Sequence, residues 1–294
     1  MRMRNNRRKT KKDLQSVCVG VSASVFMMAF MAGCVFSTGA KKEALAMFGM
    51  AAVMAAMLIA RILWDKRSKD RLVEECMTSI AYYSFDRCEY LPKIGFSEEN
   101  ILSKNILRPC GKKFESRNML KGEYKSTPFK IAEVSYGDFQ GLWLELSYPE
   151  EHFDGARIMS LDLPQGKNLM MFSRDDSLKF CESASQDFNN MFQCYFEDKD
   201  FADTVLVSSR MNDLYNIRKE ISCPFLVSYQ KNEMVVLIRT DCRMNDVFNA
   251  EEGTELVQSA RVEKAVKCFT DYLQADYNIM PVAESSRKKR YLGI

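Results

Sequence analysis

The sequence predicts an α+β protein, in which an N-terminal transmembrane helical hairpin is followed by a cytosolic domain with an antiparallel sheet and flanking helices. Three observations predict this class. Two uncharged apolar runs, Val17–Phe36 and Ala44–Ala60, lie near the start of the chain. A dense basic segment precedes them. The rest of the chain mixes strand and helix patterns in an order that does not fit regular βαβ winding.

The lengths of the two apolar runs predict two membrane spans. A bilayer core of roughly 30 Å needs about 20 helical residues, and residues 17–36 meet this length without a charge. The second run extends to Trp64 if Arg61 reaches toward the lipid headgroups. A pair of buried core helices is the alternative, which these lengths disfavour. We therefore predict spans at 17–36 and 44–64, joined by a short external loop at 37–43.

The distribution of basic residues predicts the orientation of these spans. Residues 1–16 form a basic tail with seven Lys and Arg side chains and one acid. The second span is followed by Lys66, Arg67, Lys69 and Arg71, whereas the loop holds only Lys41 and Lys42. Because basic residues are retained on the cytoplasmic side, we expect a multi-pass membrane protein. Its N- and C-termini would both be cytoplasmic.

A lipoprotein signal is the rival interpretation of the same segment. The run Met31-Ala32-Gly33-Cys34 follows a basic start and an apolar stretch. In a lipoprotein Cys34 would be lipidated and the domain exported. A second apolar run follows almost at once, which an exported lipoprotein would not need. The sequence favours the hairpin and leaves lipidation of Cys34 open.

Charge distribution predicts the partners. The whole chain carries +3, residues 1–64 account for +8, and the remainder is therefore −5. Without Arg287-Lys288-Lys289-Arg290 it is −9. Because an acidic domain repels polyanions, we expect no nucleic-acid partner. We expect the tail at 1–16 and a basic, disordered tail at 281–294 to contact anionic lipid of the bilayer.

The cytosolic domain, residues 65–280, opens with local helix and strand signals. Asp65–Tyr82 is predicted as a helix continuous with the second apolar run, and Ser97 followed by two acids indicates another helix start. Strand patterns run from Asn118 to Asp162. Within them, the dipeptide Asp154-Gly155 predicts a turn that joins the strand around Leu142–Leu144 to a return strand at Arg157–Leu163.

The second half of the domain carries clearer periodicity. Two segments on either side of Gln230–Glu233 predict an antiparallel hairpin. The last segment places Val262, Val266, Phe269 and Leu273 on one helical face. The predicted elements are a strand at Phe188–Phe196, a helix at Asp200–Ile221 broken near Ser208-Ser209, hairpin strands at Phe225–Tyr229 and Met234–Ile238, and a helix at Thr254–Ala275.

The sequence predicts no catalytic, cofactor-binding or metal-binding residues. The single histidine, His152, lies among acids, but neighbouring positions converge poorly on one ion, so we interpret it as an exposed loop residue. The acidic pairs Asp175-Asp176 and Glu251-Glu252 fit loop or helix-start charges. Phosphate-binding, dinucleotide-binding and serine-hydrolase motifs are all missing from the sequence. These features disfavour an enzyme without excluding one.

Cysteine usage agrees with a cytosolic domain. The chain has ten cysteines, no two of them closer than twelve positions, so it contains no C-x-x-C motif. In a reducing compartment such scattered thiols serve as small apolar side chains.

Several short motifs resemble a known family. The run Phe139-Gln140-Gly141-Leu142-Trp143, with Leu146-Ser147-Tyr148 and Phe153–Arg157 after it, is similar to a hallmark run of an uncharacterised bacterial membrane protein family, Domain of Unknown Function 3137. Residues 187–202 resemble a second block, and Phe225–Ile238 its closing hairpin. The sequence departs at Arg117 and Asn118, where members often carry an acidic pair. The resemblance implies two spans ahead of the domain and the cytoplasmic (inner) membrane of a bacterium. The family has no assigned activity, so no function carries over from it.

Three functional hypotheses follow. The favoured one is a membrane-anchored protein with a non-catalytic cytosolic interaction or sensing domain. The alternative is a membrane-tethered enzyme whose site forms from carboxylates that are scattered in the sequence. A lipid-facing structural protein is the third.

Overall fold

The computed structural model describes residues 41–148, 155–163, 177–240 and 259–275. They fall into two compact units that divide between Glu75 and Cys76. Helix α2, Lys41–Ser84, is 44 residues long and contributes to both. The predicted continuity of residues 65–82 with the second apolar run is therefore confirmed.

The structure describes only the second of the two predicted membrane spans. Span 17–36 lies outside the described residues, and span 44–64 falls within α2. Among the helices of the described part of the chain, none has the combination of length and apolar character that a membrane crossing requires.

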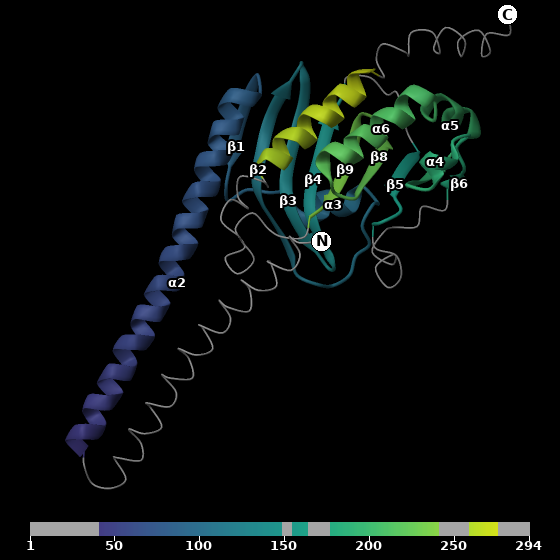
Figure 1. The fold of residues 1–294 in the computed structure, drawn as a ribbon. Coiled ribbons are helices and arrows are strands. Elements are labelled where there is room, and N and C mark those ends of the chain that lie inside the picture. The colour runs from purple at the N-terminus through teal and green to yellow at the C-terminus, as the bar shows by residue number, and fades with distance from the viewer. Residues whose placement is uncertain (1–40, 149–154, 164–176, 241–258, 276–294) are drawn as a thin grey trace, which may run out of the picture. The chain divides into compact units, whose positions relative to one another are not determined.

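The second unit is built on a nine-stranded sheet with the order β1-β2-β3-β4-β9-β8-β5-β7-β6 (Figure 1). All of its neighbouring strands are antiparallel, which confirms the predicted α+β class. The strands are β1 Arg87–Leu91, β2 Phe114–Tyr124, β3 Thr127–Tyr136, β4 Phe139–Ser147, β5 Ala156–Ser160, β6 Lys179–Cys181, β7 Phe192–Phe196, β8 Phe225–Gln230 and β9 Glu233–Arg239.

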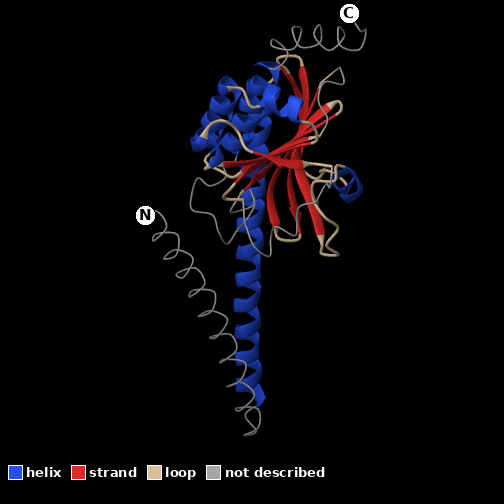
Figure 2. Cartoon of the chain, turned by 90° about the vertical axis from the view of Figure 1, so that its right-hand side faces the viewer, coloured by secondary structure: helices blue, strands red, loops and turns tan. Residues whose placement is uncertain are grey.

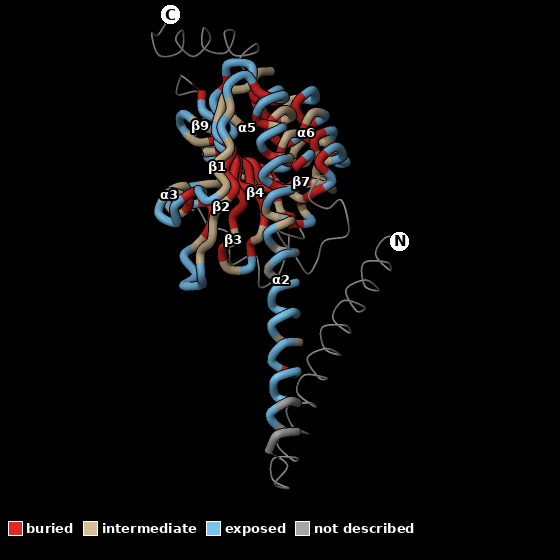
Figure 3. The backbone as a smooth tube through the Cα atoms, turned by 90° about the vertical axis from the view of Figure 1, so that its left-hand side faces the viewer, coloured by how far each residue is buried: buried red, intermediate tan, exposed pale blue. Residues whose placement is uncertain are grey.

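Helices cover both faces of this sheet. Figure 2 shows most of them gathered on one face, while α3 lies on the other, where Figure 3 labels it. The predicted cap is confirmed, since Ser97 accepts a hydrogen bond from the backbone N–H of Asn100. The predicted break near Ser208 is also confirmed. The helices are α3 Glu98–Ser103, α4 Gln186–Asn189, α5 Lys199–Val205, α6 Ser208–Ile221 and the helix at 259–275.

Each face of the sheet has its own core. On the α3 side, Trp143 is fully buried and packs with Phe96, Ile101 and Leu237. On the opposite side, the apolar stripe predicted for the last helix is buried, and the ring of Phe269 lies 5.2 Å from that of Phe225. Strands β3 and β4 are mostly buried (Figure 3), as expected for central strands covered on both sides. Residues 254–258 of the predicted helix lie outside the described residues.

The predicted pairing of residues 157–163 with the strand around Leu142 is wrong. Strand β4 pairs with β3 and β9, whereas β5 pairs with β7 and β8. Gly155 does have the positive φ of a turn, +78°, but a turn dipeptide identifies only a change of direction. The β8–β9 hairpin, distant in sequence, lies between the two strands, and β9 pairs along its whole length with Gly141–Ser147 of β4.

The strand predicted at 188–196 is shorter than expected. Ser185 caps α4, and β7 begins only at Phe192. The rings of Phe188 and Phe192 stack at 4.8 Å. Apolar residues four positions apart fit one face of a helix as well as a strand, which explains the error. The sequence does not predict the edge strands β1 and β6 or the first four residues of β2.

Candidate functional site at the β2 bulge

Strand β2 is interrupted by a β-bulge next to its centre. Arg117 pairs with Glu133 and Leu120 with Ile131, so two residues, Asn118 and Met119, stand opposite one residue of β3. Asn118 has φ +57° and is only 3% exposed. Asparagine tolerates this left-handed conformation better than most residues. Bulges of this kind redirect side chains and are frequent beside functional sites.

The bulge organises a hydrogen-bonded network around Glu133. The amide of Asn118 donates to Glu133 Oε2 at 2.7 Å and accepts from the Tyr90 hydroxyl at 2.9 Å. Arg117 Nε lies 3.4 Å from the same carboxylate oxygen. The Ser116 hydroxyl donates to the Glu133 carbonyl at 2.9 Å. The buried carboxylate of Glu133 is thus held by Asn118 of the bulge and by Arg117 just before it, while Tyr90 of β1 holds the Asn118 amide.

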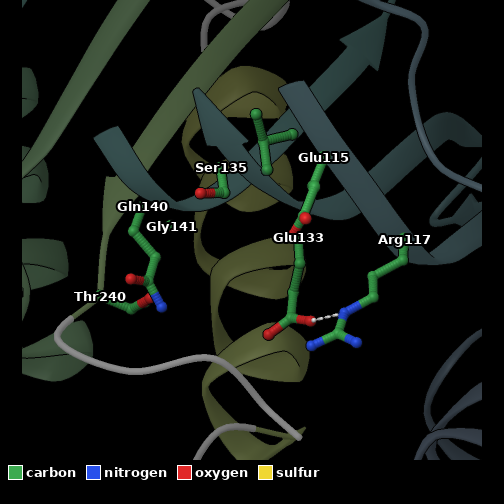
Figure 4. A pocket seen from close by; sticks show the side chains of 8 residues that line it. Glu115, Arg117, Glu133, Ser135, Gln140, Gly141 and Thr240 are labelled. Atoms are coloured by element: carbon green, nitrogen blue, oxygen red, sulfur yellow. Dashed lines mark ion pairs between the residues drawn. The ribbon is translucent and has the colours of Figure 1, made fainter. Parts of the chain in front are cut away.

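This network borders a small, shallow pocket that is open to solvent. Figure 4 shows Glu115, Arg117 and Glu133 on one side, with Gln140 and Thr240 on the other. Gly141 forms part of the floor, where an added Cβ would lie 2.0 Å from the carbonyl oxygen of Ile238. Both carboxylates at the pocket are ion-paired, Glu133 with Arg117 and Glu115 with Lys113.

A second polar group lies on the opposite face, around Glu145. This residue is 5% exposed and accepts a hydrogen bond from the Trp143 indole at 3.1 Å. Burial raises the pKa of the Glu145 carboxyl, and the charge of Glu233 raises it further, while the Trp143 hydrogen bond and two lysines oppose the rise. The lysines are Lys104 and Lys130. A carboxyl with a raised pKa marks a candidate acid or base.

The segment that follows α3 covers Glu145 and is held in place by an ion pair and two hydrogen bonds. Lys104 forms an ion pair with Glu233, and its carbonyl accepts a hydrogen bond from Gln230 at 2.9 Å. The carbonyl of Asn105 accepts one from Arg157 at 3.3 Å. Because these contacts hold the segment in place, Glu145 is enclosed and has the environment of a structural group.

The structure adds no metal or cofactor centre in the parts of the chain that it describes. Among those residues, no group of three or more His, Cys, Asp or Glu side chains is placed to hold a metal ion. The polar residues that the sequence brought into consideration, His152, Asp175-Asp176 and Glu251-Glu252, lie outside the described residues.

Sequence reasoning missed Glu133 and Glu145. The available signal was a glutamate inside an otherwise apolar strand, as in Leu142–Leu146. By contrast, Arg117 and Asn118, where the sequence departs from the family pattern, do adjoin a candidate site.

Two of the cysteines that the structure describes, Cys194 and Cys223, are buried apolar side chains, whereas Cys110 is exposed. All seven in the described residues are free thiols. Cys194 is buried, and burial raises the pKa of its thiol to about 12. At neutral pH this thiol remains protonated and unreactive.

Comparison with known proteins gives a family and a distant structural likeness. The chain matches no curated protein. A solved structure, that of the mycobacterial trehalose monomycolate transport factor A, TtfA, is similar at 10% identity and a TM-score of 0.40, covering 67% of this chain and 94% of that chain. The family model described as "Protein of unknown function (DUF3137)" matches residues 137–277, which include β4 and all later described strands and helices. Over residues 137–277 the chain is thus similar to the DUF3137 family of proteins of unknown function.

Proposed function

We propose that the protein is a membrane-anchored interaction or sensing module of the bacterial inner membrane, with a non-catalytic cytosolic domain. The exposed apolar side chains of α2 carry the proposal. Within the second apolar run these side chains are 44–75% exposed, and in water such a surface is unfavourable by about 25 cal/mol per Å². Lipid would cover them. They are Leu45, Phe48, Met50, Val53, Met57, Ile59 and Trp64.

The proposed topology follows the basic residues. Spans at 17–36 and 44–64 would leave both termini in the cytoplasm. The basic tails at 1–16 and 281–294 would contact anionic lipid, and the acidic domain between them would avoid nucleic acid and bind a protein partner.

The geometry of the bulge pocket supports a binding role over catalysis. Its charged groups are engaged with other protein groups: Arg117 with Glu133, and Glu115 with Lys113 at 2.6 Å. Catalytic groups, in contrast, converge on a place where a substrate can sit. The second candidate, a membrane-tethered enzyme, would use Glu145, a carboxyl whose pKa is raised by burial, but the segment at Lys104 encloses it.

Charge placed on the exposed apolar surface of α2 tests the anchor. We expect the wild-type chain to stay in the membrane fraction after alkaline carbonate extraction. The double variant Val53→Asp/Met57→Asp should leave a larger fraction of the chain in the extract, because each charge at mid-span costs about 3 kcal/mol and only the span at 17–36 then holds the chain in lipid. Leu72→Asp, a 50% exposed leucine on the same helix beyond the apolar run, is the matched control and should remain bound. Complete extraction of the wild type would contradict the anchor.

Cells that produce the wild-type chain also allow a test of the side of the membrane on which the domain lies. Cys110 is exposed, so a membrane-impermeant maleimide should label it in lysed but not in intact spheroplasts, with Cys110→Ser as the control. Labelling of Cys110 in intact spheroplasts would place the domain outside.

An interaction module should also retain its partner during purification. We expect a tagged full-length chain, extracted in mild detergent after crosslinking in cells, to recover the same protein in about stoichiometric amounts in repeated preparations. A two-span protein with the same tag serves as the control for non-specific recovery. Repeated recovery of the same proteins from both baits, and of nothing else, would count against the interaction role.

A further inference from the structure

The turn between β2 and β3 has a strained backbone. Its central residues, Lys125 and Ser126, have φ values of +49° and +61°. This pair of left-handed residues closes a two-residue hairpin, a position at which Asn-Gly or Asp-Gly is strongly preferred. Neither residue here is glycine or asparagine. Such a conformation persists only where surrounding contacts hold it, and strain of this kind is frequent in switch regions.

Two separate parts of the chain hold this turn. From one side, Asp86, two residues after the end of α2, accepts a hydrogen bond from the backbone N–H of Lys125 at 3.0 Å. From the other, Gln274 of helix 259–275 donates to the carbonyl of Lys125 at 2.6 Å and to the hydroxyl of Thr127 at 3.3 Å. The ammonium of Lys125 also lies 2.8 Å from Asp271 of the same helix. The N–H and the C=O of a single strained residue therefore bind the two different segments.

A direct hydrogen bond also joins the same two segments beside the turn. The hydroxyl of Ser84, the last residue of α2, donates to Glu263 at 2.8 Å. The ring of Phe85 packs at 4.8 Å from Phe129 and 6.0 Å from Tyr124, the residue that leads into the turn. The end of α2, the turn and the last helix thus form one continuous set of contacts within the second unit.

We propose that the turn Tyr124–Thr127 is a strained latch, through which the segment Ser84–Asp86 controls the docking of helix 259–275 on the sheet. When Asp86 withdraws its hydrogen bond, the left-handed backbone relaxes. The carbonyl of Lys125 then rotates away from Gln274, because the orientations of its N–H and C=O are coupled through φ and ψ. The latch does not depend on the membrane anchor. In an anchored protein it would convert a movement of α2 into release of the last helix.

Hydrogen exchange measured by mass spectrometry on the detergent-solubilised full chain tests the latch. Asp86→Ala should accelerate exchange in peptides from 259–275 about fivefold, the equivalent of one lost hydrogen bond. Asp138→Ala is the matched control, since it removes the exposed Lys112–Asp138 ion pair beside the next hairpin turn and should leave 259–275 unchanged. Faster exchange confined to residues 84–91 in Asp86→Ala would overturn the proposal.

A strain-relieving variant separates the latch from simple loss of a contact. Ser126→Gly allows the left-handed conformation without steric cost and keeps Lys125, so in the Asp86→Ala background it should restore slow exchange of 259–275. Failure to restore it would show that strain in the turn does not couple the two segments, and would also overturn the proposal.

Discussion

Replacing Trp143 with alanine is expected to destabilise the domain by about 3–5 kcal/mol. The side chain is fully buried at the centre of the α3-side core, with its ring centroid 6.4 Å from that of Phe96. Its removal leaves a cavity and also deprives the buried carboxylate of Glu145 of its indole donor. Circular dichroism during thermal unfolding of the full chain in detergent measures the effect.

Two variants refine this prediction. Trp143→Phe keeps most of the volume but lacks the N–H, and should lose about 1–3 kcal/mol. Trp64→Ala removes a tryptophan that is 74% exposed, and should leave the unfolding temperature unchanged. Equal unfolding temperatures for Trp143→Ala and Trp64→Ala would contradict the assignment of Trp143 as a core residue.

The second large effect is expected from Glu145→Gln, which should stabilise the protein at neutral and alkaline pH. Burial raises the pKa of Glu145 in the folded state above its unfolded value. Its contribution to stability is therefore fully present below the unfolded pKa of about 4.3 and is lost as the pH rises through the folded pKa. The loss amounts to about 1.4 kcal/mol for each unit by which the pKa is raised. Glutamine stays neutral and can still accept the Trp143 hydrogen bond.

Unfolding temperatures measured between pH 4 and pH 8 check this expectation. The curves of wild type and Glu145→Gln should coincide at the acid end and diverge as the pH rises, with the variant more stable. Glu89→Gln, an exposed glutamate on the edge strand β1, should follow the wild type throughout. Curves for Glu145→Gln and wild type that stay parallel over the whole range would show that Glu145 is not desolvated in the folded protein.

The sequence predictions that succeeded all depend on interactions between residues close together along the chain. Ser97 caps its helix through the residue three positions on, and Phe225–Ile238 pairs across a tight turn. The stripe that contains Val262 and Phe269 repeats within one helix. The pairing predicted for residues 157–163 failed because the true partners of β5 are β7 and β8, more than thirty positions away.

The candidate site could not be predicted from the sequence, because it too depends on residues that are distant along the chain. Glu133 becomes a positioned carboxylate only when β2 forms a bulge and Tyr90 comes into contact from β1. The carboxyl group of Glu145 is removed from water only when the segment at Lys104 packs over it. Neither glutamate has neighbours in the sequence that predict its environment.

By itself the sequence determined the α+β class, most helices, the β8–β9 hairpin and the resemblance to the family, because caps, turns and periodicities are set by residues within a few positions of each other. Only the tertiary structure decided the strand order, the burial of Glu133 and Glu145, and the strain at Lys125-Ser126. Each of these depends on groups that are distant in sequence, and their desolvation and backbone strain arise only when packing brings those groups together.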